Sequence, residues 1–334
     1  VGHVSGGHFN PAVTIGLAVA TPSVDEGALF VTNWFGTGTL SNSEITGGFN
    51  DNVRVNNTAS GTLNRLTVNN TTIRNSGNNH GLAFYTCLGG SGSTCPGVGA
   101  MNLTVTNSTF TDNSSNSLDI GAKEGSSMDV VLRGNTFQST SLVTVGGPGG
   151  SVLLSIDHSA DMTFDVDNNH FINPRVSAFT AFVSNQTLAA ASMTGKFRNN
   201  TIGTAGTPLS GSRQGSGMQV TATGAATVTM SITGNTIRNW ATNYGMDLSA
   251  GDGGATGPQV NLTVTGNTLN LDSPNVNHLH GISSVMGTTS TGGAVTACVD
   301  IGGAGALAFA SSCGAGVAGG AVAGAAAGAG ACAI

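Results

Sequence analysis

Charged side chains are scarce in this sequence. Among its 334 residues, 16 are acidic and 10 are basic, so charged residues make up 8% of the chain and the net charge is −6. The basic residues form no positive stripe, which a nucleic-acid-binding surface needs in order to neutralise phosphates. We therefore expect no nucleic-acid partner, and we expect a solvated surface made of Asn, Thr, Ser and Gly.

Apolar runs long enough to cross a bilayer are also missing. A spanning helix needs about 20 apolar residues, and the run Val13–Ala20 is shorter than that. The segment 302–334 has no charge but consists almost entirely of Gly, Ala and Val. Ala and Gly are weakly apolar, and Gly weakens helices. We interpret 302–334 as a low-complexity tail rather than a membrane anchor, and we expect no membrane contact.

The five cysteines do not form a metal-binding pattern. No two of them make a CxxC pair, which argues against a zinc ribbon. Cys87 and Cys95 enclose the flexible segment LGGSGST, and a disulfide between them would close this loop. Geometry decides whether that bond forms. We favour this pairing over one between Cys298 and Cys313.

What the sequence does contain is a ten-residue phrase that recurs along the chain. Its clearest copy is Met128–Phe137, MDVVLRGNTF. Apolar residues at Met128, Val130 and Leu132 stand two apart, which is the period of a strand with one buried face. A Gly-Asn corner follows, and Phe137 points back inside. A phrase repeated at this length predicts a solenoid.

The apolar residue that closes each copy of the phrase serves as an anchor for one coil. The first and last anchors give a mean repeat of (269 − 45)/7 = 32 residues. A short second phrase such as GLAF at Gly81–Phe84 follows most anchors, and a looser run precedes each main phrase, so each coil should hold two or three strands. The anchors are Ile45, Ile73, Phe110, Phe137, Phe171, Ile202, Ile237 and Leu269. The residues expected to share one inner face of the main strands are Leu103, Leu132, Phe164, Met230 and Leu262.

Asparagine recurs at the main corner of the coils. It tolerates left-handed backbone angles and bonds its own turn. Stacked corners would align the amides in a ladder along the axis. We therefore assign these residues a structural role rather than a role as sugar ligands. They are Asn70, Asn107, Asn135, Asn169, Asn200, Asn235 and Asn267.

The coils, with their NxxF and GNTI corners, resemble right-handed parallel β-helix proteins of the pectin-lyase-like superfamily over about residues 34–301. The resemblance is to repetitive, adhesin-like and autotransporter-like passengers of bacterial surfaces. It implies an all-β chain with a single right-handed parallel β-helix of about 8–9 coils, which we assign to 29–301. It also implies a secreted or bacterial cell-surface protein with a structural, adhesive or glycan-binding role, no catalysis and no cofactor. Its partners would be glycans or a host or cell surface.

The stretch 1–20 resembles a different family. Its segment His8–Gly16, HFNPAVTIG, matches the first Asn-Pro-Ala loop of the aquaporins, in which Asn10, Pro11 and Ala12 would form the motif. An aquaporin also needs a second such motif and about six apolar spans, and neither follows in this sequence. We therefore interpret 1–28 as a fragment or as a cap on the first coil. A channel assignment would rest on this fragment alone.

The same fold also carries enzymes, so catalysis is the alternative to a binding role. The motifs of polygalacturonases are absent. Two segments of this sequence resemble pectate lyases: Ser155–His158, SIDH, and Pro174–Val176, PRV. This resemblance implies a calcium-dependent polysaccharide lyase whose acidic site and arginine base would be Asp157, Asp165, Asp167 and Arg175. Asp165 and Asp167 stand two apart, so on a strand they would share one face.

Two further pairs are candidates for binding. His278 and His280 stand two apart and could form a metal pair, although no carboxylate or thiol is near them in sequence, which favours a loop pair. Trp240 and Tyr244 could form a platform for sugar stacking. The competing interpretation is that they cover a corner beside the strand that follows Gly245.

Overall fold

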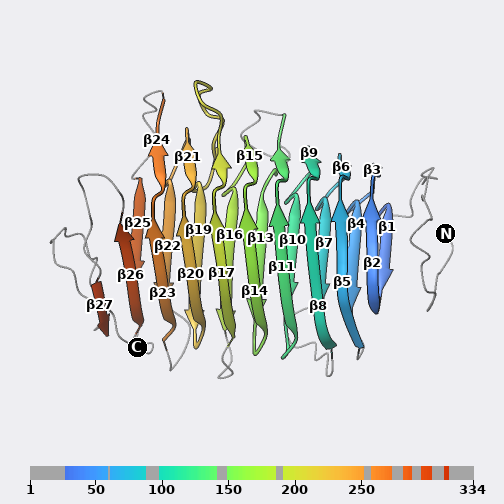
Figure 1. Ribbon diagram of the computed structural model, residues 1–334, viewed down its shortest axis with the longest axis horizontal. Helices are drawn as coiled ribbons and strands as arrows, with labels where there is room; N and C mark the ends of the chain where they lie inside the picture. Colours follow the sequence, from blue (N-terminus) through green and yellow to red (C-terminus); the bar gives the residue numbers. More distant parts are fainter. Residues whose placement is uncertain are drawn as a thin grey trace.

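The chain folds into three sheets of parallel strands that run along one axis. The computed structural model describes residues 27–58, 61–87, 98–140, 149–185, 191–251, 257–272, 281–287, 295–302 and 312–315. All regular secondary structure in this part of the chain is β-strand, with 27 strands. Apart from β27, each sheet takes every third strand, so each coil from β1–β3 to β22–β24 gives one strand to each sheet (Figure 1). The predicted right-handed parallel β-helix of about 8–9 coils is confirmed.

The three sheets differ in strand length. The first sheet has nine strands: β1 Leu29–Thr32, β4 Val53–Asn57, β7 Leu82–Thr86, β10 Leu118–Ala122, β13 Val152–Asp157, β16 Phe179–Asn185, β19 Met218–Gly224, β22 Met246–Gly251 and β25 Ile282–Met286. The second sheet has ten: β2 Gly36–Ser41, β5 Gly61–Asn69, β8 Val98–Thr106, β11 Ser127–Arg133, β14 Asp161–Asp167, β17 Ser192–Arg198, β20 Thr227–Thr233, β23 Gln259–Thr265, β26 Thr296–Gly302 and β27 Ser312–Ala315. The third sheet has eight short strands: β3 Glu44–Thr46, β6 Thr72–Arg74, β9 Thr109–Thr111, β12 Thr136–Gln138, β15 His170–Ile172, β18 Thr201–Ile202, β21 Thr236–Arg238 and β24 Thr268–Asn270.

The core is built by side chains that alternate along each strand. On the second sheet, in-register pairing stacks one inner row from Leu103 through Val130, Phe164 and Gly195 to Met230 and Leu262. Leu132 is buried on the same inner face but lies in the next row, with Val105 and Val166. The predicted inner face is confirmed, and the register assigns Leu132 to the neighbouring row.

The anchors form one continuous row in the third sheet. Register partners connect all eight, from Ile45 through Phe137 to Leu269. At the middle of this row, the rings of Phe110 and Phe137 have centroids 5.2 Å apart, and those of Phe137 and Phe171 lie 5.0 Å apart. Offset-stacked rings at this spacing attract each other in addition to the area they bury. The repeat period read from the sequence therefore corresponds to one turn of the solenoid.

The asparagine ladder exists, but it contains fewer asparagines than predicted. From Asn135 to Asn267, each side-chain Nδ2 donates to Oδ1 of the next ladder asparagine, at 2.9–3.1 Å. The two earlier positions belong to Thr71 and Ser108: the Thr71 amide donates to Ser108 Oγ at 3.2 Å, and the Ser108 amide donates to Asn135 Oδ1 at 2.9 Å. Asn70 and Asn107 lie one residue before the ladder, with φ of 49° and 48°. They provide the left-handed turn that Gly134 provides in the next coil, so their prediction as ladder members is wrong.

Several predicted features lie outside the described residues. These are the Asn-Pro-Ala segment with Asn10, Pro11 and Ala12, the cysteine Cys95, the pair His278 and His280, and most of the tail 302–334.

Cys87 and Cys298 are both disulfide-bonded. Cys313 is the register partner of Cys298 across the antiparallel pair β26 and β27. In the part of the chain that the structure describes, no helix is long and apolar enough to cross a membrane.

Candidate functional site

Among the described residues, the outer face of the second sheet holds the largest connected group of ion-paired side chains. On β14, Met162, Phe164 and Val166 point into the core, so Asp161, Thr163, Asp165 and Asp167 point outward. The prediction that Asp165 and Asp167 share one face is therefore confirmed. In a chain with so few charges, this grouping identifies the first place to look for a function.

Register places basic residues on both sides of these aspartates. Asp167 lies opposite Arg133 on β11 and opposite Arg198 on β17. Asp165 lies opposite Lys196 on β17. Directly opposite residues in neighbouring strands are close enough for charges to interact. The result is a row of alternating sign across three coils.

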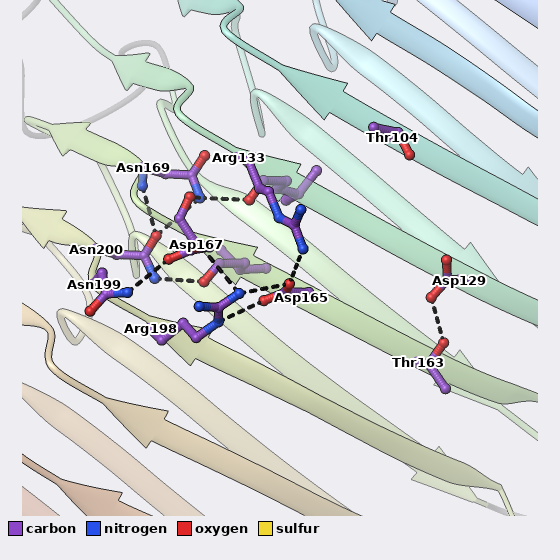
Figure 2. A network of polar contacts seen from close by, with 12 residues as sticks. Thr104, Asp129, Arg133, Thr163, Asp165, Asp167, Asn169, Arg198, Asn199 and Asn200 are labelled. Carbon is purple, nitrogen blue, oxygen red and sulfur yellow. Dashed lines mark hydrogen bonds and ion pairs between the residues drawn. The ribbon is translucent and has the colours of Figure 1, made fainter.

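The carboxylate of Asp165 is the centre of the resulting network (Figure 2). Arg133 Nη2 lies 2.5 Å from Asp165 Oδ2, while Arg198 binds both oxygens, with Nε 3.1 Å from Oδ1 and Nη2 3.0 Å from Oδ2. Arg198 Nη2 also lies 3.2 Å from Asp167 Oδ2. Asn199 donates to Asp167 Oδ1 at 2.9 Å. We call Arg133, Asp165, Asp167 and Arg198 the charged ladder.

The electrostatics keep the Asp165 carboxylate ionised. Burial alone would raise the pKa of Asp165, but hydrogen bonds from Arg198 and Arg133 outweigh that effect and leave the pKa below its usual value of 3.8. The hydrogen bond to Asp165 in turn raises the pKa of Arg198. At neutral pH Asp165 is a carboxylate whose two oxygens are already engaged by guanidinium groups.

A second, smaller group continues this pattern on neighbouring strands. Arg65 on β5 binds Asp129 on β11 at 2.6 Å and donates to Thr104 Oγ1 on β8 at 2.8 Å. Thr163 on β14 donates to the other oxygen of Asp129 at 2.7 Å. Polar contacts therefore link the outer face of four successive strands, and they do so with paired rather than isolated charges.

The residues predicted for a lyase site are distributed over several parts of the coil. Asp157 ends β13 in the first sheet, where its Oδ2 lies 3.2 Å from His158 Nδ1. Asp165 and Asp167 are on β14 in the second sheet, and Arg175 follows β15 at the corner between the third and first sheets. Among the described residues, no group of three or more His, Cys, Asp or Glu side chains could hold a metal ion.

The aromatic candidates for a sugar platform have different environments. Trp240 is only 3% exposed and belongs to the hydrophobic core, and its ring lies 3.3 Å from the position that a Cβ would occupy at Gly245. Tyr244 is half-buried, and its carbonyl accepts a hydrogen bond from the Gly217 amide at 2.9 Å. A ring this deeply buried offers no face to a sugar, which favours the interpretation that Trp240 covers a corner.

The basic members of the charged ladder were missed by sequence reasoning. Arg133 was noted only as part of the repeated phrase, and Arg198 was not singled out. Aligning the copies of the phrase on their anchors would have placed Arg133, Asp167 and Arg198 at the same outward position of three consecutive coils. Comparison with protein-family models, with curated proteins and with solved structures finds no match to the chain. The fold defines a parallel β-helix solenoid, and its function has to be argued from its own residues.

Proposed function

We propose that this chain is a secreted or surface-displayed repeat protein whose second sheet binds carbohydrate and performs no catalysis. The observation that carries the proposal is the saturation of Asp165 by Arg133 and Arg198. A general base must be able to accept a proton near the working pH. A carboxylate with a lowered pKa and two guanidinium partners is poorly suited to that role, and it would bind calcium only after losing those partners.

The rest of the second sheet supports a binding role. Beside the charged ladder, the outward positions of β17, β20 and β23 are mostly hydroxyl and amide side chains in register, such as the row Thr194, Thr229 and Asn261. Neighbouring strands lie about 4.8 Å apart, so these groups repeat along the axis. Sugar hydroxyls both donate and accept hydrogen bonds. A polysaccharide lying along the axis would meet many weak contacts of one kind, which add up through multivalency.

Display outside the cell fits the remaining features. A core of stacked rows gives a rigid rod, and the few charges on its surface are largely paired. Cys87 and Cys298 are disulfide-bonded, and such bonds persist in oxidising compartments. We therefore place the protein outside the cell or on the surface of a bacterium, with glycans of a host or cell surface as its partners.

The binding proposal is tested by removing three contacts from one row. Thr194→Val, Thr229→Val and Asn261→Val together delete the polar groups while keeping residues suited to a strand. Three lost hydrogen bonds of about 1 kcal/mol each should weaken binding to a retained polysaccharide by roughly a hundredfold. Co-sedimentation with insoluble polysaccharides and a glycan array measure this.

The matched control changes the same number of side chains elsewhere. Thr72, Thr109 and Thr136 are half-buried register partners on the outer side of the third sheet. Their replacement by Val should leave binding unchanged. Equal losses in both triple variants, or no retention on any glycan, would contradict the proposal.

The lyase alternative has its own assay. When the protein is incubated with polygalacturonate and calcium, we expect no unsaturated product, which is measured by its absorbance. Product formation that disappears in Arg175→Ala would replace the binding proposal by calcium-dependent cleavage.

A further inference from the structure

Two neighbouring strands of the second sheet carry only uncharged polar side chains on their outer face. On β20 and β23, the alternate residues from Val228 to Ile232 and from Val260 to Val264 are buried, so the residues between and beside them point outward. The register pairs the outward residues of the two strands in four rows. We call these eight residues the uncharged patch: Thr227, Thr229, Ser231, Thr233, Gln259, Asn261, Thr263 and Thr265. All eight side chains are hydroxyls or amides, and none is aromatic.

The uncharged patch differs from the charged ladder in whether its polar groups already have partners. In the ladder, Asp165 and Asp167 accept hydrogen bonds from arginine and asparagine side chains of adjoining coils. By contrast, none of the eight patch side chains forms a hydrogen bond with another residue that the structure describes. Thr229, Gln259 and Thr263 are exposed, and the other five are half-buried. The donors and acceptors of the patch are therefore available to a ligand, whereas those of the ladder are occupied.

Two side chains of opposite charge border the uncharged patch. Lys196 on β17 and Asp300 on β26 lie in one register row with Ser231 and Thr263, on opposite sides of the patch. Lys196 also lies opposite Asp165 on β14, so its charge is offset on the side away from the patch as well. One cation and one anion at opposite borders favour a ligand without net charge between them.

The other cation at the border is already bound. Arg198, which lies opposite Thr233 in the register, pairs with the carboxylates of Asp165 and Asp167. An acidic polymer on the patch would lose part of the hydration of its carboxylates without gaining a free guanidinium in return. The net charge of −6 on the chain adds repulsion at longer range. The charges around the patch therefore disfavour a polyanion.

We infer that the ligand of the second sheet is an uncharged polysaccharide, and that it binds at the uncharged patch. The inference rests on the glycan-binding function proposed above and specifies the class of glycan. The hydroxyl groups of a neutral sugar both donate and accept hydrogen bonds, as do the side chains of Ser, Thr, Asn and Gln. Because the patch has no aromatic ring on which a sugar could stack, each sugar unit makes only weak polar contacts. Affinity must then build up over several units of a polymer.

The test is the retardation of the intact chain in native gels that contain a soluble polysaccharide. The uncharged set is dextran, galactomannan and mixed-linkage glucan, and the acidic set is polygalacturonate and alginate. We expect retardation by an uncharged polysaccharide that sodium chloride does not weaken, because salt screens only interactions between charges. Ser231→Val and Thr263→Val together should weaken it by roughly thirtyfold, because two hydrogen bonds are lost. Unchanged affinity in this double variant would overturn the assignment of the patch.

Lys196→Gln is the matched control, because it removes an exposed cation beside the patch without changing the patch itself. It should leave the affinity for an uncharged polysaccharide unchanged. Stronger retardation by an acidic polysaccharide, reduced by salt and weakened at least about tenfold in Lys196→Gln, would overturn the uncharged class and leave the glycan-binding proposal intact. No retardation by any polysaccharide of either set would overturn both proposals.

Discussion

Arg133 lies directly opposite Asp167 in the register of β11 and β14, yet its guanidinium binds Asp165, two residues earlier on β14. This diagonal reach leaves Asp167 to Arg198 and Asn199 and gives Asp165 two arginine partners. The three strands are thus joined by charges as well as by backbone hydrogen bonds. Side chains of this length reach diagonal neighbours in a sheet. Ion pairs therefore form with diagonal residues as well as with the residue directly opposite.

Replacing Asp165 with Asn should destabilise the fold modestly. The substitution leaves Arg133, Arg198 and Lys196 as three neighbouring positive charges. Because the pairs are partly exposed and screened, we expect a loss of about 1 kcal/mol in the free energy of unfolding. Urea denaturation measures it, and the loss should shrink at high salt. The control is Glu44→Gln in an isolated exposed pair with Arg74, where we expect almost no change.

The ionisation of Asp165 should contribute to the pH dependence of the free energy of unfolding. Its pKa lies below 3.8 in the folded chain, so the folded state holds the proton less tightly than the unfolded state. The stabilisation is then complete above the unfolded pKa and is lost as the pH falls through the folded pKa, which places the window below about pH 4. Unfolding followed from pH 6 to pH 2 should show a shallower decline for Asp165→Asn. Parallel curves for both proteins would contradict this.

The contribution of Asp247 to stability should depend on pH in the opposite direction. Burial raises the pKa of this aspartate, so its charged form destabilises the fold, and its contribution to stability declines as the pH rises through the folded pKa. Asp247→Asn should therefore raise the urea midpoint at pH 7, and the gain should disappear below about pH 4. A lower midpoint at pH 7 would mean that the bond from Gln219, 3.4 Å long, outweighs the burial.

The coil was predictable because its signals are local. Alternation along Met128–Phe137 gives the inner face of β11, and the spacing of anchors such as Phe110 and Phe171 gives the coil. The prediction of the asparagine ladder was partly wrong, for a physical reason. Asn70 and Asn107 are suited to a left-handed corner as well as to an amide ladder, and only their distance from the anchor shows which role applies.

The candidate site was less predictable because its contacts cross coils. Asp165 and Arg198 are 33 residues apart, and the coils between anchors vary in length, so the register of the outer face does not follow from one phrase. The longer segment 203–217 also folds back onto the coil before it. Sequence alone offered no signal for that stacking.

The stacked phenylalanines should dominate the stability of the central coils. Phe137 is fully buried between Phe110 and Phe171. Phe137→Ala removes a ring from a packed row and leaves a cavity, so we expect a loss of about 3–5 kcal/mol in the free energy of unfolding. Phe182, a residue of the first sheet that is 37% exposed, is the control, and Phe182→Ala should cost far less. Equal urea midpoints for the two variants would refute the assignment of the row as the core.

The asparagine ladder should be sensitive at its centre and tolerant beside it. Asn169 is 2% exposed, and its Oδ1 accepts from the amide and the side chain of Asn135. Asn169→Ala leaves both donors buried without that partner, so we expect a loss of about 2–4 kcal/mol. Asn70 is exposed and has a positive φ, so Asn70→Gly should be almost neutral because glycine adopts that conformation freely.

Hydrogen exchange measures the effect of the ladder on local stability. In Asn169→Ala the amide of Asn135 should exchange faster, while amides near Ile45 should not change; uniform acceleration along the solenoid would argue that the ladder acts only through global stability.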